Sequence, residues 1–163
     1  MLTSDIDPKL FRGEIEGKTV IVTGGAGGIG AAIVCVFHDH GANVVVADLP
    51  STRQAASTLL ASRPKDKANT MFVEVDIQDW ESMKHLYRTT IERFGSVDIV
   101  IANAGTMEKQ PFFDIDHLDE EPTGAFKVID INVKGTMNSE SVAYAMAVAL
   151  HLLLSLPPPL FRS

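Results

Sequence analysis

A glycine-rich segment holds the residues whose types and spacing are best suited to chemistry. Residues 23–30 have the sequence TGGAGGIG and lie between a β-branched run and apolar residues at helical spacing. Glycines there permit a tight turn and a close approach of the backbone to a phosphate. The start of the following helix offers unpaired N–H groups and a partial positive charge. The segment predicts a pyrophosphate-binding turn, with an ordinary sharp glycine turn as the alternative.

A carboxylate lies at the position where such a turn needs one. Asp48 ends the valine-rich run 43–47, about twenty residues beyond the glycines. Its oxygens would accept hydrogen bonds from the two ribose hydroxyls of NAD and repel the additional phosphate of NADP. The alternative is a strand-end Asp that caps the next helix. Arg53 nearby would weaken the repulsion, so the sequence predicts NAD and leaves NADP open.

Alternating periodicities predict the elements that position these residues. Strands are expected over 18–23, 43–47, 70–75 and 97–102, and helices over 28–40, 51–62, 79–94 and 123–154. Strands alternating with helices predict a parallel sheet with right-handed crossovers. The expected fold is α/β: a Rossmann-like sheet of about four strands in the order 3-2-1-4, with helices on both faces and incomplete at its carboxyl end.

Four motifs, in order, resemble the short-chain dehydrogenase/reductase family. The first is the Thr-Gly-x-x-x-Gly-x-Gly pattern of residues 23–30. VDI at 75–77 resembles the segment with the family's third-strand Asp. DIVIANAG at 98–105 resembles the fourth strand and its Asn-Ala-Gly turn, with Ala102 in place of the more usual first Asn. INVKG at 131–135 resembles the segment in which an Asn supports a catalytic water chain.

This resemblance assigns roles to individual residues. It implies cofactor contacts for Gly24, Gly28, Ile29, Gly30, Asp48, Asp76, Asn103 and Lys134. Within that set, Asp76 matches the residue that contacts the adenine, and Ile29 contributes its backbone. Lys134 matches a position where family members often carry a basic residue near the cofactor. Asn132 matches the supporting catalytic Asn. The implied reaction is hydride transfer between a nicotinamide and an alcohol or carbonyl substrate.

The remaining catalytic residues of the family have no counterpart in this sequence. The family needs a Tyr followed four residues later by a Lys, and a Ser from a separate strand. Tyr144 is followed at that spacing by Val148, and Ser141 lies only three residues before Tyr144. Both are expected in the core or on a helix surface, and Tyr87 lies on a helix away from the strand ends. A catalytically silent dinucleotide-binding module and a truncated fragment are therefore the alternatives to an active oxidoreductase.

The chain divides into three parts at the sequence level. Residues 1–17 are an amino-terminal extension, 18–135 form a partial NAD(P)-binding domain, and 136–163 form a divergent helical tail with a proline-rich end. The change after Gly135 is typical of a replaced carboxyl terminus, by truncation, a misread exon or splicing. The apolar fourth strand is then an edge that the tail helix or a partner chain must cover, which leaves a homo-oligomer open.

Composition limits the kinds of partner and the cellular location that the sequence predicts. The chain has 163 residues, enough for one domain, and 14 basic against 21 acidic residues give a net charge of -7. This balance argues against nucleic acid as a partner. Cys35 is the only cysteine, no signal-type segment is present, and the apolar stretch 142–156 is shorter than a membrane span. These features predict a cytoplasmic protein without a membrane partner.

His38 and His40 point in different directions on one helix, so no metal site is expected.

Overall fold

Four parallel strands form the sheet of this protein. The computed structural model describes residues 13–62, 69–107 and 123–155. The strands are β1 (Thr19–Thr23), β2 (Asn43–Asp48), β3 (Thr70–Glu74) and β4 (Ile99–Ile101). Their order in the sheet is β3-β2-β1-β4, and all pairings are parallel. The predicted α/β fold and its strand order are confirmed.

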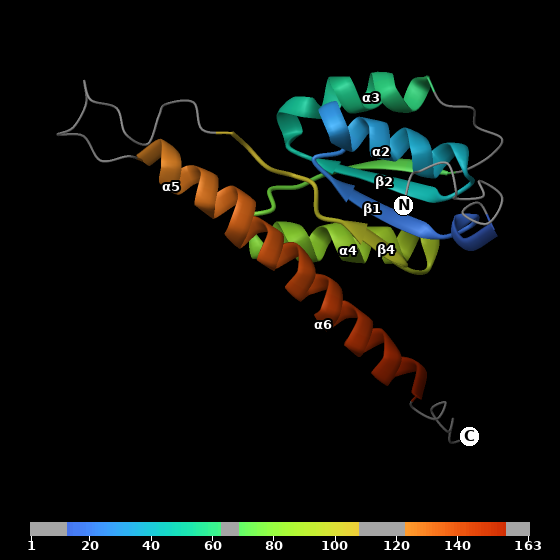
Figure 1. The fold of residues 1–163 in the computed structure, drawn as a ribbon. Coiled ribbons are helices and arrows are strands. Elements are labelled where there is room, and N and C mark those ends of the chain that lie inside the picture. Colours follow the sequence, from blue (N-terminus) through green and yellow to red (C-terminus); the bar gives the residue numbers. More distant parts are fainter. Residues whose placement is uncertain (1–12, 63–68, 108–122, 156–163) are drawn as a thin grey trace, which may run out of the picture.

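Helices cover both faces of the sheet (Figure 1). The helices α2 (Gly28–Asp39) and α3 (Arg53–Ala61) pack on one face, where Val34 and Ala56 join the buried core. A short 3₁₀ turn at Pro50–Thr52 precedes α3, so that helix begins later than the sequence predicts. The helices α4 (Trp80–Phe94) and α6 (Thr136–Ser155) pack on the other face.

Alternation along the strands divides the core into two layers. Val20 and Val22 of β1 pack under α2 and α3, whereas Ile21 between them packs on the side of α4 and α6. The parallel pairing of Ile21 with Val45 continues this alternation into β2. Strands buried on both faces read as continuous β-branched runs, which is why the sequence identified β1 and β2 so clearly.

The helix α4 is capped at both ends by the residues that the sequence predicted. Asp79 is the N-cap of α4, and its side chain accepts hydrogen bonds from the amides of Glu81 (2.7 Å) and Ser82 (3.0 Å). Gly95 ends the helix in the left-handed conformation, with a φ of 86°. The predicted bounds of this helix are confirmed.

The last helical segment contains an irregularity that the sequence did not predict. The expected helix over 123–154 consists of α5 (Thr123–Ile129), a π-helical segment at Asp130–Gly135 and α6, which together form one long rod (Figure 1). Gly135 lies so close to the sheet layer that a Cβ there would be 2.5 Å from Cδ1 of Ile77. π-Helical turns often occur where a helix must place particular side chains.

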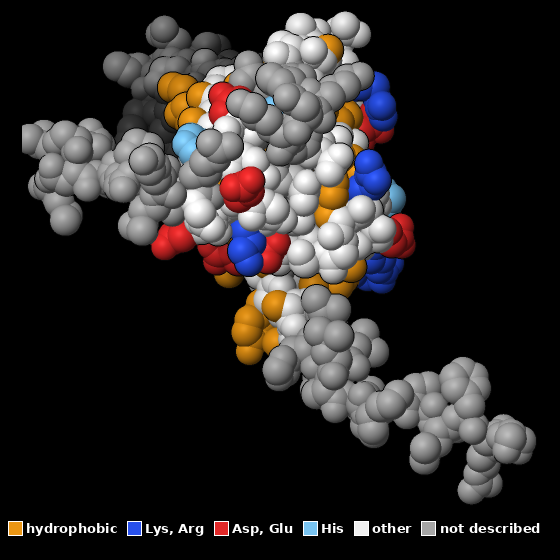
Figure 2. All heavy atoms as spheres, turned by 90° about the vertical axis from the view of Figure 1, so that its right-hand side faces the viewer, with side chains coloured by type: hydrophobic (Ala, Val, Ile, Leu, Met, Phe, Trp, Pro, Cys, Tyr) orange, Lys and Arg blue, Asp and Glu red, His pale blue; other side chains and the backbone are white. Residues whose placement is uncertain are grey.

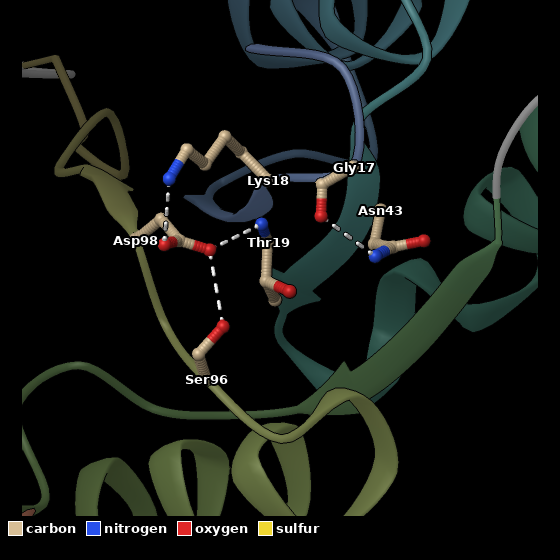
Figure 3. Close-up of polar contacts among 6 residues, drawn as sticks. All are labelled: Gly17, Lys18, Thr19, Asn43, Ser96 and Asp98. Carbon is tan, nitrogen blue, oxygen red and sulfur yellow. Dashed lines mark hydrogen bonds and ion pairs between the residues drawn. The ribbon is translucent and has the colours of Figure 1, made fainter. Parts of the chain in front are cut away.

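A carboxylate network fastens the amino ends of β1 and β4 (Figure 3). Asp98 accepts hydrogen bonds from the Thr19 amide (2.8 Å) and the Ser96 hydroxyl (3.1 Å), and it pairs with Lys18 at 3.5 Å. Partial desolvation raises the pKa of Asp98, but the hydrogen bonds and the Lys18 charge outweigh it and hold the pKa below its ordinary value. The ionised carboxylate therefore stabilises the folded state.

This network makes a specific contribution to stability that depends on pH. Because folding lowers the pKa of Asp98, the contribution is present above the unfolded-state pKa and is lost as the pH falls through the folded-state pKa. We expect Asp98→Asn to lower the free energy of unfolding at pH 7 by about 1–2 kcal/mol. The difference from the wild type should shrink as the pH falls through the folded-state pKa and disappear below it. Urea unfolding at pH 7 and at a series of acidic pH values measures this, and a deficit that stays constant down to the lowest pH would contradict it.

The face of the molecule where the strands begin carries mixed charges. Figure 2 shows Lys and Arg side chains beside Asp and Glu rather than gathered into one basic patch on this face. Among the helices that the structure describes, none combines the length and apolar content that a bilayer crossing requires.

Candidate functional site

A cleft of about 870 Å³ opens at the carboxyl ends of the strands. Its walls are the glycine turn after β1, Asp48 at the end of β2, residues 75–78 after β3 and residues 103–107 after β4. Four residues along one face of the rod complete it: Gly124, Lys127, Val128 and Ile131. In doubly wound α/β sheets, ligands bind at this edge because the connections diverge there.

The glycine turn is shaped first by the protein's own packing. Gly24 has a φ of +66°, and a Cβ there would lie 2.8 Å from Cα of Ala104. A Cβ at Gly30 would overlap the carbonyl oxygen of Gly24 and lie 2.7 Å from Nδ2 of Asn103. The sequence interpretation attributed these glycines to a tight turn and to the close approach of a phosphate. The structure shows how tight the turn is, since side chains at these positions would collide with the chain itself.

The amino end of α2 is left without a side-chain cap. Its N-cap is Gly27, which makes no side-chain capping hydrogen bond, and the first turn carries no acidic residue. A Cβ at Gly27 or Gly28 would meet nothing within 4 Å, so the space above the turn is open. Unpaired N–H groups beside open space are suited to an anion such as a pyrophosphate.

Thr23 and Asn103 join the glycine turn to the end of β4. The buried Thr23 hydroxyl accepts hydrogen bonds from the amides of Asn103 and Ala104, both at 3.1 Å. In return, Nδ2 of Asn103 donates to the carbonyls of Thr23 (3.0 Å) and Gly24 (3.3 Å). Asn103 thus fixes the turn and lines the cleft at the same time.

The Asp48 carboxylate lies at the rim of the same cleft. One oxygen accepts a hydrogen bond from the Ala26 amide at 3.0 Å, and the other accepts from the Leu49 amide at 2.8 Å. A carboxylate has about four acceptor sites, so both oxygens keep capacity for ribose hydroxyls. Asp48 therefore connects the turn of the first strand to the end of the second.

Arg53 is engaged by another partner. Its guanidinium pairs with Glu74, with Nη2 at 2.7 Å and Nε at 2.8 Å from the same oxygen, and it lies 5.4 Å from the ring centroid of Phe72. Arg53 is not among the residues that line the cleft. Its positive charge is therefore offset by Glu74 rather than offered to a phosphate near Asp48.

Asp76 forms the adjoining wall after β3. One carboxylate oxygen accepts a hydrogen bond from the Gln78 amide at 2.9 Å, which closes a tight turn before α4. The Asp76 amide donates to the Ser82 hydroxyl at 3.0 Å. These bonds hold the carboxylate at the cleft wall, where it lies among the lining residues.

Asn132 holds the rod to the segment after β4. Its Nδ2 donates to the Thr106 carbonyl at 2.9 Å, and its Oδ1 accepts from the Thr106 amide at 2.8 Å. A Cβ at Gly105 would lie 3.1 Å from this Oδ1, so the glycine keeps the approach open. Asn132 does not itself line the cleft.

The structure brings most of the expected cofactor residues together. The cleft is lined by Gly24, Ile29, Gly30, Asp48, Asp76 and Asn103. Gly28 belongs to the turn without lining the cleft, and Lys134 is exposed and lies outside it. The lysine that lines the cleft is Lys127, which the sequence analysis did not identify. Lys127 lies on the same helical face as Gly124 and Ile131, and this helical spacing is visible in the sequence.

The two tyrosines lie away from the cleft lining. Tyr144 is 74% exposed on α6, so it is a helix-surface residue, as one of the two expectations had it. Tyr87 is buried, and its hydroxyl donates to the Ser139 carbonyl at 2.9 Å. Burial raises the pKa of Tyr87 well above its ordinary value, which makes it unsuited to exchange a proton.

Metal-binding residues do not gather in the described part of the chain. No group of three His, Cys, Asp or Glu side chains lies there in an arrangement that could hold an ion. The acidic segment at residues 114–121 lies outside the described residues.

Comparison with known proteins identifies the family. Residues 18–149 match the short chain dehydrogenase family. The matched range contains the four strands, the glycine turn and the cleft described above. The chain therefore belongs to the short-chain dehydrogenase family.

Individual relatives agree with this assignment. The chain is 42% identical to (+)-borneol dehydrogenase 1 of Salvia officinalis over 58% of this chain and 34% of that protein. It is 39% identical to Short-chain dehydrogenase reductase 5 of Arabidopsis thaliana over 74% of this chain and 44% of that protein. The chain thus spans less than half the length of these curated relatives.

A solved structure shares the fold. It is the short-chain dehydrogenase/reductase from Brucella melitensis titled glucose/ribitol dehydrogenase, which superposes with a TM-score of 0.68 at 28% identity. The match covers 81% of this chain and 53% of that one.

Proposed function

We propose that the cleft binds NAD, with the pyrophosphate on the glycine turn and the adenosine ribose at Asp48. The observation that carries this proposal is the uncapped amino end of α2, which opens onto the same cleft as the Asp48 carboxylate. Asp76 is the proposed contact to the adenine. Asn103 is the proposed cofactor contact beside the glycine turn. The cleft volume of about 870 Å³ lies within the range of cofactor pockets.

The proposed reaction follows from the family. A bound NAD supplies a hydride acceptor, and the proposed substrate is an alcohol or its carbonyl product. Asn132 occupies the position of the family's supporting catalytic Asn, and in this chain its side chain holds the backbone of Thr106. The Ser, Tyr and Lys of the family have no counterpart in the printed sequence. Dinucleotide binding without turnover is therefore the function that the residues of this chain support best.

The cellular setting belongs to the same proposal. Cys35 is the only cysteine of the chain, so no disulfide can form within it. This composition favours a reducing compartment, and we propose the cytoplasm.

Calorimetric titration with NAD tests the proposal directly. We expect saturable binding to the folded chain with one site per molecule. Absence of binding at millimolar NAD, with an intact circular dichroism spectrum, would overturn it.

The choice between NAD and NADP gives a sharper test. Asp48 would place a carboxylate beside the additional phosphate of NADP. The positive charge of nearby Arg53 is neutralised by Glu74. We expect NAD to bind at least about tenfold more tightly than NADP, because like charges in a partly desolvated site repel strongly. Comparing the two dissociation constants measures this.

Two variants separate the contributions to that preference. Asp48→Asn should reduce the preference for NAD, since the repulsion disappears while the side-chain shape is kept. Glu74→Gln should raise the affinity for NADP alone, because it frees the charge of Arg53. Tighter binding of NADP to the wild type would show that a cation outweighs Asp48.

A further inference from the structure

We propose that Asn138 is a positioning residue that sets the adenine selectivity of the cleft by holding the loop that carries Asp76. The inference rests on the proposed dinucleotide function. It assigns a role in ligand choice to a residue on α6, which is not among the residues that line the cleft.

The first step is the contact between α6 and the loop after β3. Nδ2 of Asn138 donates hydrogen bonds to two consecutive carbonyls, those of Ile77 at 3.0 Å and Gln78 at 3.2 Å. Both bonds span about sixty positions of the chain and are partly buried. One amide group thus fixes the orientation of two successive peptide planes.

The second step runs from those peptide planes to the carboxylate. The Asp76 carboxylate accepts from the amide of Gln78 at 2.9 Å and from its side chain at 3.4 Å, and the Asp79 amide donates to the Asp76 carbonyl at 3.0 Å. The residues that Asn138 holds are therefore the residues that orient the Asp76 carboxylate. If their carbonyls rotate, the donors to Asp76 rotate with them.

The third step is the rigidity of the support. Gly135 allows α6 to lie against Ile77, where a Cβ would be only 2.5 Å from Cδ1 of that residue. The buried Tyr87 hydroxyl donates to the Ser139 carbonyl at 2.9 Å and ties α4 to α6 next to Asn138. The amide of Asn138 is thus presented from a fixed base.

The Asp76 carboxylate determines which group of the adenine ring the cleft recognises. A carboxylate accepts a hydrogen bond from the exocyclic amine of adenine but repels the carbonyl that replaces this amine in hypoxanthine. A site built to pair with a donor rejects an analogue that lacks it. Selectivity for NAD over nicotinamide hypoxanthine dinucleotide therefore reports the placement of Asp76.

The test compares Asn138→Leu with a matched variant, Asn43→Leu. Asn43 also donates from Nδ2 to a backbone carbonyl, that of Gly17 at 3.3 Å, but at the opposite end of the sheet (Figure 3). We expect Asn138→Leu to lower the ratio of affinities for NAD and its hypoxanthine analogue by about five- to tenfold, the effect of one misplaced hydrogen bond. Asn43→Leu should leave the ratio unchanged. Asn138→Ala serves as the second variant if Leu prevents folding.

Amide hydrogen exchange on the ligand-free protein gives a readout that does not depend on NAD. Exchange at Gln78 and Asp79 should accelerate in the Asn138 variant and not in the Asn43 variant. Unchanged exchange and an unchanged affinity ratio would overturn the inference while leaving the proposed function intact. A wild type that binds neither dinucleotide would instead overturn the proposed function. Faster exchange with an unchanged ratio would show that Asn138 supports the loop without setting selectivity, which also overturns the inference.

Discussion

The purified chain is expected to bind NAD without oxidising alcohols or reducing ketones measurably above background. General acid–base catalysis by a positioned side chain contributes about a hundred- to ten-thousand-fold to such rates. In the printed sequence, neither Tyr87 nor Tyr144 is followed four residues later by a Lys. Tyr87 is buried with a raised pKa, and Tyr144 is exposed outside the cleft lining. Neither can supply the proton transfer.

The measurement is a change in absorbance of the nicotinamide across panels of alcohols and ketones, with Tyr144→Phe as the control. We expect the wild type and this variant to be indistinguishable from buffer with free NAD. Turnover well above background would contradict the prediction. A rate that is lost in Tyr144→Phe alone would identify Tyr144 as an acid–base residue.

Gly30→Val is expected to abolish dinucleotide binding. A Cβ at this position would overlap the Gly24 carbonyl and press on Nδ2 of Asn103. The turn must therefore move, and the bond from Asn103 to Gly24 is lost with it. Overpacking of this kind also lowers the free energy of unfolding by about 1–3 kcal/mol, in addition to its effect on binding. We expect at least about a hundredfold weaker NAD binding, since the turn no longer holds its shape.

Gly27→Ala provides the matched control for that experiment. A Cβ at Gly27 meets nothing within 4 Å, and its backbone is extended, with a φ of -154°. The variant should fold as stably as the wild type, so any loss of affinity reports ligand contact alone. Calorimetry and thermal unfolding on both variants separate the two effects. Wild-type affinity in folded Gly30→Val would remove the basis for the phosphate site.

The sequence could predict the sheet because its information is local and redundant. The runs at β1 and β2 are rich in β-branched residues, glycines mark the turns, and Asp79 and Gly95 mark the ends of α4. Each signal acts within a few residues of the structure it determines. The strand order then follows from the connection rules of parallel sheets. The same reasoning placed Asp48 and Asp76 at one edge, where the structure has them line one cleft.

The features that the sequence could not predict depend on contacts between distant residues. Arg53 at the start of α3 is neutralised by Glu74 of β3, twenty-one positions away, and the packing of α3 against β3 brings them together. The π-helical segment 130–135 coincides with the pairing of Asn132 and Thr106, which no helical periodicity announces. The hold of Asn138 on the loop after β3 is equally non-local.

The uncapped end of α2 also bears on how a ligand arrives. The positive ends at this site are peptide dipoles, whose field fades within a turn of the helix. At longer range an approaching dinucleotide, itself an anion, meets a chain with a net charge of -7. Attraction at contact is thus combined with repulsion at a distance. Added salt screens the distant term first, so moderate ionic strength favours association here, the reverse of what holds for phosphate sites built from Lys and Arg.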